Sequence, residues 1–131
     1  MRYMLLIYTN ENAEQTPKQR QQIIEGHRRA MEDATLRGFL RGAEPLFPTS
    51  SATTLREVSG KMVLTDGPFA ETKEQLAGYY ILECESLDDA IAIARQIPTA
   101  CGGGDGCVEI RPIRPFPAPA ESTGVSRAGR A

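Results

Sequence analysis

His27 is the only histidine in this 131-residue chain, and its side chain is the one whose ordinary pKa, about 6.5, suits proton transfer near neutral pH. It lies four residues from Ile23 and four from Met31, so at helical spacing it belongs on or beside an apolar stripe. A histidine in that position is either a hydrogen-bonded core group or an acid–base residue within reach of a substrate. The residues alone leave both interpretations open.

A second candidate for chemistry is Asp66, which belongs to a decapeptide at residues 65–74 that reads Thr-Asp-Gly-Pro-Phe-Ala-Glu-Thr-Lys-Glu. Asp66-Gly67 is a common hairpin dipeptide, but Pro68 has no N–H with which to close a two-residue turn. The Asp66 carboxylate is therefore available to accept backbone N–H groups, as in an Asx turn, or to face a ligand.

A long amphipathic helix is expected to position His27. Thr16 is the expected N-cap, Pro17 takes the first helical position, and Gln19 completes a capping box. Gly38 is the expected stop. The inward stripe of this helix is expected to be Ile23, Ile24, His27, Met31 and Ala34.

The sheet on which this helix would pack is predicted from composition and alternation. The expected strands are residues 3–8, 53–58, 61–65, 79–84 and 108–114. The first and the fourth of these strands are apolar on both faces, and the fourth, at residues 79–84, is expected at the centre of the sheet. Residues 39–60 are rich in Pro, Ser, Thr and Gly and are expected to form an extended connector around the second strand, with a turn at Ser59-Gly60.

A second helix is expected between Ser86, as its N-cap, and Pro98. Its apolar face is expected to be Leu87, Ala90, Ile91, Ala94 and Ile97. Pro112 cannot donate to a ladder, so the last strand is expected at an edge of the sheet or near a strand end.

The resulting order, β-α-β-β-β-α-β, predicts a ferredoxin-like α+β sandwich with both helices on one face of a mainly antiparallel sheet. The other face would then be a large apolar patch on a monomer, so we expect it to form the interface of a homodimer. The folded domain is expected to span residues 1–116, followed by a flexible C-terminal tail at residues 117–131.

The charge balance narrows the class of partner. Fifteen Lys and Arg residues against 17 Asp and Glu residues give a formal net charge of −2, which provides no general field for nucleic acid or an anionic membrane. The apolar run at residues 3–8 is too short for a signal-peptide core or a spanning helix. We therefore expect a cytoplasmic protein with a small-molecule ligand and no nucleic-acid or membrane partner.

Neither a metal nor a cofactor is expected. Cys84, Cys101 and Cys107 form no CxxC pair and, together with His27, lack the close ligand spacing of zinc sites. The glycine-rich loop at residues 102–106 follows a helix and precedes a strand, which is the reverse of the order in phosphate-binding loops. It is expected to be a flexible connector.

The decapeptide at residues 65–74 resembles the signature of the DGPFAETKE proteins, the DGPF branch of the YCII-related superfamily. The run Val-Glu-Ile-Arg-Pro-Ile at residues 108–113 is also typical of that family, and the resemblance covers about residues 1–116. It implies a dimeric α+β arrangement. It also implies a link to extracytoplasmic-function sigma factors, since genes for such proteins often neighbour theirs.

What the resemblance implies for the site is a histidine on the first helix with an aspartate near it at a pocket. His27 and Asp66 match that description as catalytic residues, while Asp33 is an alternative aspartate that points to a different side of the helix. Tyr79 and Phe69 are the substrate-binding candidates, although Phe69 also suits the role of an apolar anchor.

Two functions follow as hypotheses. The first is acid–base catalysis of an isomerisation, an elimination or a hydrolysis on a small molecule, in which Asp66 orients His27 and His27 moves the proton. The alternative is a non-catalytic dimer that binds a metabolite or serves regulation together with a sigma factor. No nucleophile is implied, because Ser50 and Ser51 lie outside any nucleophile-elbow motif.

Overall fold

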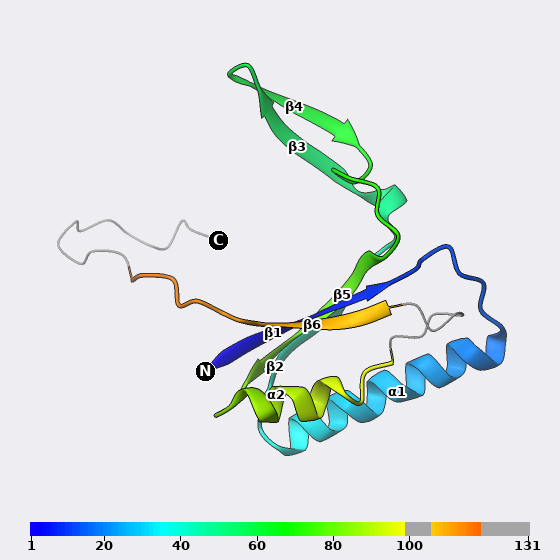
Figure 1. The fold of residues 1–131 in the computed structure, drawn as a ribbon, viewed down its shortest axis with the longest axis vertical. Coiled ribbons are helices and arrows are strands. Elements are labelled where there is room, and N and C mark those ends of the chain that lie inside the picture. The colour runs from blue at the N-terminus through cyan, green and yellow to red at the C-terminus, as the bar shows by residue number, and fades with distance from the viewer. Residues whose placement is uncertain (99–105, 119–131) are drawn as a thin grey trace, which may run out of the picture.

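A four-stranded antiparallel sheet forms the centre of the protein in the computed structural model, which describes residues 1–98 and 106–118 (Figure 1). In their order across this sheet, the strands are β2 (Leu40–Pro45), β5 (Gln75–Glu83), β1 (Arg2–Thr9) and β6 (Gly106–Pro112). Each neighbouring pair is antiparallel. β1 and β5 lie in the middle, so the prediction that residues 79–84 form a central strand is confirmed.

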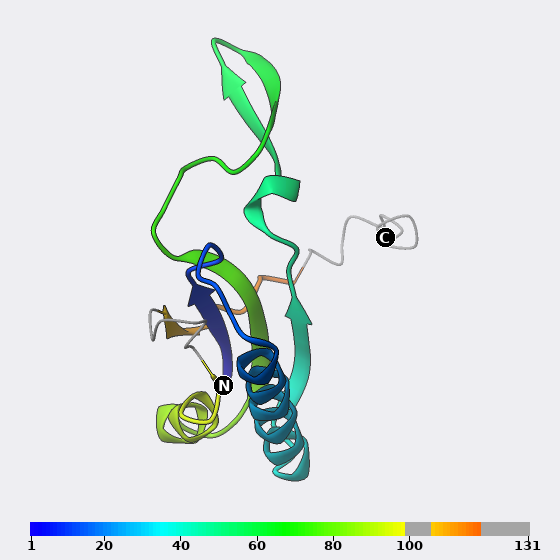
Figure 2. The same cartoon turned by 90° about the vertical axis from the view of Figure 1, so that its right-hand side faces the viewer.

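Two helices, α1 (Pro17–Leu36) and α2 (Leu87–Ala94), cover the same face of the sheet (Figure 2). The side chains that point toward them alternate along the central strands: Leu5 and Ile7 in β1, and Tyr80 and Leu82 in β5, are buried. The prediction of an α+β fold with two helices on one face of an antiparallel sheet is confirmed, and the strand order is consistent with a ferredoxin-like sandwich.

The start and the end of α1 are fixed by the local sequence as predicted. The Thr16 hydroxyl oxygen accepts the Gln19 N–H at 3.1 Å, and the Gln19 side-chain oxygen accepts the Thr16 N–H at 2.8 Å. At the other end, Gly38 has φ +77° and its N–H donates to the Thr35 carbonyl oxygen at 3.0 Å. Phe39 N–H donates to an earlier carbonyl in the same turn, which completes a Schellman motif.

The predicted inward stripe of α1 is confirmed at Ala34, which is buried, and at Met31, which packs against the core, and it is wrong at Ile24, which is 53% exposed. The fully buried positions of α1 are Gly26, Ala30 and Ala34, because small residues allow the helix to lie close to the segment after α2. A Cβ atom added at Gly26 would lie only 2.7 Å from the Pro98 ring. Ile23, Ile24, His27 and Met31 therefore stand beside this contact rather than in it.

The second helix is shorter than predicted, since it ends at Ala94 rather than at Pro98, and its buried face is shifted. Ser86 caps it as expected, accepting the Asp89 N–H at 3.3 Å. The side chains buried against the sheet come from Ala90 and Ile93, with Ile97 in the turn that follows, whereas Leu87 is half-exposed.

The prediction for residues 39–60 needs a correction. The segment holds an additional strand, β2, which pairs with β5 at the edge of the main sheet. Gly42 and Pro45 lower its strand propensity, but an edge strand tolerates a proline at its end because one side of it makes no ladder bonds. A 3-10 turn, Thr49–Ser51, follows. β5 also begins at Gln75, earlier than the predicted residue 79.

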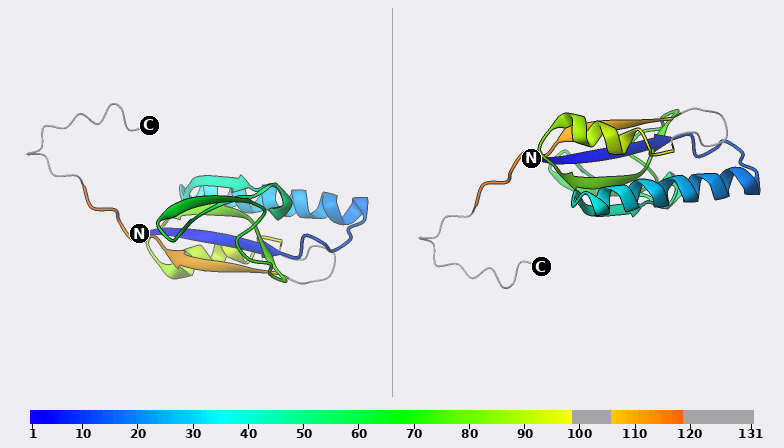
Figure 3. Two further views of the ribbon diagram at one scale, coloured as in Figure 1. Left: turned by 90° about the horizontal axis from the view of Figure 1, so that it is seen from above. Right: turned by 90° about the horizontal axis from the view of Figure 1, so that it is seen from below.

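The hairpin predicted around Ser59-Gly60 is confirmed, with positive φ at both turn residues (53° and 81°). Its strands, β3 (Thr53–Val58) and β4 (Lys61–Asp66), form a two-stranded sheet of their own and do not join the main sheet, contrary to the predicted order. We call this hairpin the arm. It projects on the side of the main sheet opposite the helices (Figures 1 and 3).

That side of the main sheet carries Met4, Leu6, Tyr79 and Ile81, all partly exposed, and we call it the open face. Within the residues that the structure describes, no helix is long and apolar enough to cross a membrane. The predicted glycine loop at residues 102–106, except Gly106, and the predicted tail beyond residue 118 lie outside the described residues.

Candidate functional site

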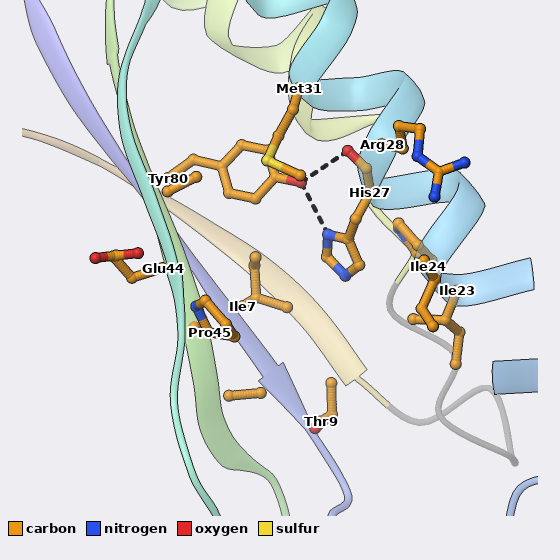
Figure 4. Close-up of a pocket in the computed structure, with 14 residues that line it drawn as sticks. Ile7, Thr9, Ile23, Ile24, His27, Arg28, Met31, Glu44, Pro45 and Tyr80 are labelled. Carbon is orange, nitrogen blue, oxygen red and sulfur yellow. Dashed lines mark hydrogen bonds between the residues drawn. The ribbon is translucent and has the colours of Figure 1, made fainter. Parts of the chain in front are cut away.

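A cavity of about 550 Å³ opens between α1 and the strands β1, β2 and β5 (Figure 4). Its walls are largely apolar and include Ile7 of β1, Ile23 and Met31 of α1, and Pro45 of β2. The polar side chains that line it belong to Thr9, His27, Arg28, Glu44 and Tyr80. An apolar hollow of this size with a few converging polar groups is the usual form of a small-molecule site.

His27 and Tyr80 form the polar pair of this cavity. The His27 Nδ1 atom lies 2.8 Å from the Tyr80 hydroxyl, which in turn lies 3.4 Å from the His27 carbonyl oxygen. Figure 4 shows the other ring nitrogen, Nε2, facing the space between Ile7 and Ile23. One nitrogen of the imidazole is therefore held by the protein and the other is presented to a ligand.

The Tyr80 hydroxyl can serve both protonation states of the imidazole. It can donate to an unprotonated Nδ1, or it can accept from a protonated Nδ1 while donating to the His27 carbonyl oxygen. In the second arrangement a neutral His27 has its lone pair on Nε2, which is the geometry that a general base requires.

Burial controls the charge of both groups. It lowers the pKa of His27 below its ordinary value, since the charged imidazolium loses solvation in the apolar cavity. It raises the pKa of Tyr80 to about 12. At neutral pH the pair is therefore an uncharged imidazole beside an uncharged phenol.

The wall formed by β2 and β5 depends on Gly78. A Cβ atom added there would lie 2.7 Å from the Glu44 carbonyl oxygen and 3.2 Å from the Pro45 Cα atom. The two chain segments also stay close at the next pair of residues, where the Leu46 N–H donates to the Ala77 carbonyl oxygen at 2.8 Å. Glycine at this position therefore allows the two strands to meet at the cavity wall.

The charged side chains at the cavity belong to its rim. Arg28 makes an ion pair with Glu25 on the same helix face, and Figure 4 shows the side chains of Arg28 and Glu44 directed away from the His27 ring. The half-exposed Ile24 also lies at this rim. The interior near Nε2 is thus apolar, with Thr9 as a hydroxyl-bearing neighbour.

Asp66, the predicted catalytic partner, lies at the end of β4 opposite Thr53 in the ladder, is exposed and does not line the cavity. In the part of the chain that the structure describes, its carboxylate makes no hydrogen bond or ion pair. The Asp66-Gly67 corner is held by other groups: the Gly67 N–H donates to the Ala52 carbonyl oxygen at 2.7 Å, and the Thr54 hydroxyl donates to the Gly67 carbonyl oxygen at 2.8 Å.

A single chain therefore does not bring His27 and Asp66 together. The alternative aspartate, Asp33, accepts hydrogen bonds from Gln96 at 2.6 Å and from Arg37 at 3.1 Å, which lower the pKa of its carboxyl. These contacts hold it against the end of α2, outside the cavity.

The two predicted substrate-binding residues also lie away from the cavity in a single chain. Tyr79 points to the open face, and Phe69, in the loop after β4, is 78% exposed. Tyr80 is the tyrosine that lines the cavity. Its role could have been found by extending the alternation of β5, because Tyr80 pairs with the inward-facing Leu5.

Among residues 1–98 and 106–118, no three His, Cys, Asp or Glu side chains gather closely enough to hold a metal ion. Cys84 is buried and Cys107 is exposed, and both are free thiols. Burial is the main cause that raises the pKa of each, so neither is an activated thiolate.

The sequence of this chain matches that of a known family. The chain belongs to the YCII-related domain family, whose sequence pattern matches residues 1–117. It is also similar to an uncharacterised protein of Rhizobium meliloti (strain 1021), with 46% identity over 76 residues. That match covers 58% of this chain and 60% of the relative, so the chain spans less than two thirds of the relative's length. Because that relative carries no assigned reaction, the function has to be argued from the site.

Proposed function

We propose that the protein binds a small molecule in the cavity between α1 and the sheet and that His27 transfers a proton to or from it. The observation that carries this proposal is the orientation of the imidazole, with Nδ1 held by Tyr80 at 2.8 Å and Nε2 facing an apolar cavity of about 550 Å³. A histidine that served only the core would have both nitrogens satisfied by the protein.

The apolar cavity supports proton transfer in two ways. A ligand that fills the cavity between its apolar walls would displace water from the reacting group, which strengthens each electrostatic interaction made there. They also keep His27 uncharged at neutral pH, so that the imidazole can accept a proton and later return it. This chemistry suits an isomerisation, an elimination or a hydrolysis that proceeds without a covalent enzyme intermediate.

We further propose that the chain belongs to the DGPF branch of its family, on the strength of the decapeptide at residues 65–74. The pairing of Asp66 with His27, and ligand contacts by Tyr79 and Phe69, stay predictions, since none of the three lines the cavity of its own chain.

The open face supports a homodimer. Met4 and Leu6 of β1 pair across the ladder with Ile81 and Tyr79 of β5, which builds a continuous apolar surface over the two central strands. No element of the described chain covers this surface, and a second open face would remove it from water. In a two-fold dimer the same patch serves both copies.

A thermal-shift screen of small metabolites tests the proposal. Compounds that bind the wild-type protein should lose their stabilising effect in Ile23→Trp, which fills the cavity, while Leu87→Trp, on the exposed side of α2, should respond like the wild type. A bound compound that is converted by the wild type but not by His27→Gln identifies the enzyme. Compounds that stabilise Ile23→Trp as much as they stabilise the wild type would contradict the proposed site.

The same screen separates the enzyme from the alternative, a metabolite-binding or regulatory dimer linked to a sigma factor. The mainly apolar lining of the cavity is the feature that favours this second function, since it supplies many contacts and few reactive groups. A ligand that His27→Gln still binds and that the wild type never converts would support binding without catalysis.

A further inference from the structure

The arm exposes an apolar surface that the described residues of its own chain leave uncovered. Leu55 and Leu64 lie directly opposite each other in the β3–β4 ladder. Met62, two positions before Leu64 in β4, lies on the same face of the hairpin. These three side chains are 57%, 70% and 60% exposed. Glu57, opposite Met62, and Asp66, near the base of the arm, add two negative charges to that face.

This hairpin has little to hold it in place by itself. A two-stranded hairpin is marginally stable in water unless it packs on another element, and neither β3 nor β4 pairs with the main sheet. The side chains of the reverse face of the arm include Arg56, Lys61 and Val63, so the hairpin has one apolar, acidic face and one mixed, basic face. Such asymmetry is typical of a strand pair with one covered side.

The open face carries a hollow of complementary character. It has a volume of about 490 Å³ and is lined by Met4, Leu6, Arg111, Pro112, Ile113 and Arg114. Apolar side chains therefore form its floor, and two arginines supply positive charge beside them. The hollow matches the arm face in hydrophobicity and opposes it in charge.

The arm and the hollow lie at opposite ends of one surface. The chain leaves the main sheet at Pro45, forms the arm, and returns to the main sheet at Gln75. Gln75 is paired with Thr9 at one end of β1. The hollow lies at the other end of β1, where Met4 pairs with Arg111. Viewed from the side opposite the helices, the arm lies over the open face (Figure 3), while Figure 1 shows that it stands clear of it.

We propose that the arm of one chain packs into the open-face hollow of a second copy, and that the second copy returns the same contact. Each chain then donates an arm at one end of its open face and receives an arm at the other, which is the reciprocal arrangement of a closed two-fold dimer. Six residues per strand at about 3.3 Å each make the arm about 20 Å long, enough to cross the strands of a partner sheet.

This inference rests on the proposed homodimer and goes beyond it, since it assigns the arm as the element that joins the two copies. Burial of Leu55, Met62 and Leu64 removes the apolar surface that the isolated hairpin exposes. Glu57 and Asp66 meet the positive charge of Arg111 and Arg114, which favours this partner over a surface of the same charge.

Two adjacent residues of β4 provide a matched test. Leu64→Asp places a charge on the apolar face of the arm, whereas Val63→Asp makes a similar change on its reverse face, where Val63 is 42% exposed. Light scattering over a dilution series is expected to show that Leu64→Asp raises the dimer dissociation constant by about tenfold or more, with Val63→Asp close to the wild type. Circular dichroism of both variants checks that the main sheet and helices remain folded.

A charge exchange tests the direction of the contact. Glu57→Arg and Arg111→Glu should each weaken the homodimer, because each places like charges together in both arm contacts. An equimolar mixture of the two variants should form a heterodimer with affinity near that of the wild type, since every arm then meets an opposite charge.

The outcomes are separable. A wild-type protein that is monomeric at micromolar concentration overturns the homodimer and this inference with it. A wild-type dimer that Leu64→Asp leaves intact, or a mixture of the two charge variants that stays as weak as each alone, overturns the arm contact and leaves the open-face dimer standing.

Discussion

The His27 imidazole is controlled by burial and by one hydroxyl, and no carboxylate among residues 1–98 and 106–118 hydrogen-bonds to it. Burial lowers the pKa of His27, and the Tyr80 hydroxyl fixes the ring through Nδ1 at 2.8 Å. An aspartate in that place would stabilise the imidazolium and raise its pKa, which favours a permanently charged group. The tyrosine instead holds the ring while leaving it neutral at physiological pH.

Replacing Tyr80 by Phe removes that hold while keeping the ring that fills the core. We expect Tyr80→Phe to lower the free energy of unfolding by about 1 kcal/mol, because the Nδ1 atom loses its partner in a half-buried site. We also expect the imidazole nitrogen shifts in NMR spectra to change, as the preference for one tautomer is lost. Tyr79→Phe, on the opposite face of β5, is the control and should leave these shifts as in the wild type; equal shifts in both variants would contradict the role of Tyr80.

At this scale, the sequence identified His27 as a candidate but did not identify the residue that contacts its ring. His27 was predictable because it is unique in the chain and lies at helical spacing from apolar residues. Its contact with Tyr80 spans 53 positions of sequence, and no local pattern reports a contact of that range. The pairing of His27 with Asp66 stays a prediction that a second copy of the chain would have to satisfy.

Among the elements, α1 determines the shape of the site. Its small residues, Gly26, Ala30 and Ala34, bring one side of the helix close to its neighbours. Ile23, His27 and Met31 line the cavity on the adjoining side. One helix thus provides both the core contact and the cavity wall.

The β2–β5 contact at the opposite wall can be tested through two glycines. Gly78→Ala is expected to destabilise the protein by about 1–3 kcal/mol and to weaken ligand binding, since the new methyl group would meet backbone atoms of Glu44 and Pro45 and push β2 outward. Gly42→Ala is the matched control in the same pair of strands, because its methyl group would lie 3.8 Å from the Ile81 side chain, an ordinary contact. Urea denaturation of both variants gives the comparison, and equal midpoints would contradict the close approach at Gly78.

Element boundaries followed from the sequence where local chemistry fixes them. Thr16, Gln19 and Gly38 marked the limits of α1 because capping hydrogen bonds act within a few residues. β2 was missed because its Gly and Pro content is that of a connector, and only its pairing with β5 makes it a strand. The separation of the arm from the main sheet is likewise a matter of long-range pairing.

At the scale of the whole molecule, the sequence predicted the sandwich because two amphipathic helices and two strands apolar on both faces admit few arrangements. It predicted one uncovered apolar surface, and the described part of the chain presents two, the open face and the apolar face of the arm. The second arises because β3 and β4 stand apart from the main sheet.

The stability of the whole protein should depend on pH through its single histidine. The pKa of His27 is lower in the folded state than its ordinary value of about 6.5 in an unfolded chain. Between these two values the unfolded chain binds a proton that the folded protein does not, so stability falls as pH falls from about 6.5 through the folded pKa. Urea titrations between pH 8 and pH 5 give the free energy of unfolding of the wild type and of His27→Gln. The value for the wild type minus the value for His27→Gln should fall as pH falls through that window. A value that rises toward acid pH would contradict the lowered pKa.

The most direct measurement of the central claim, that His27 is a neutral proton carrier facing a ligand cavity, is the NMR titration of its ring in the native protein. Because the chain has one histidine, its ring signals need no further assignment. We predict a pKa below 6.5, with one neutral tautomer dominant above it, since burial disfavours the charged imidazolium and Tyr80 holds Nδ1. A pKa at or above 6.5 would show that the imidazole is solvated or paired with a carboxylate, and it would contradict the site proposed for this protein.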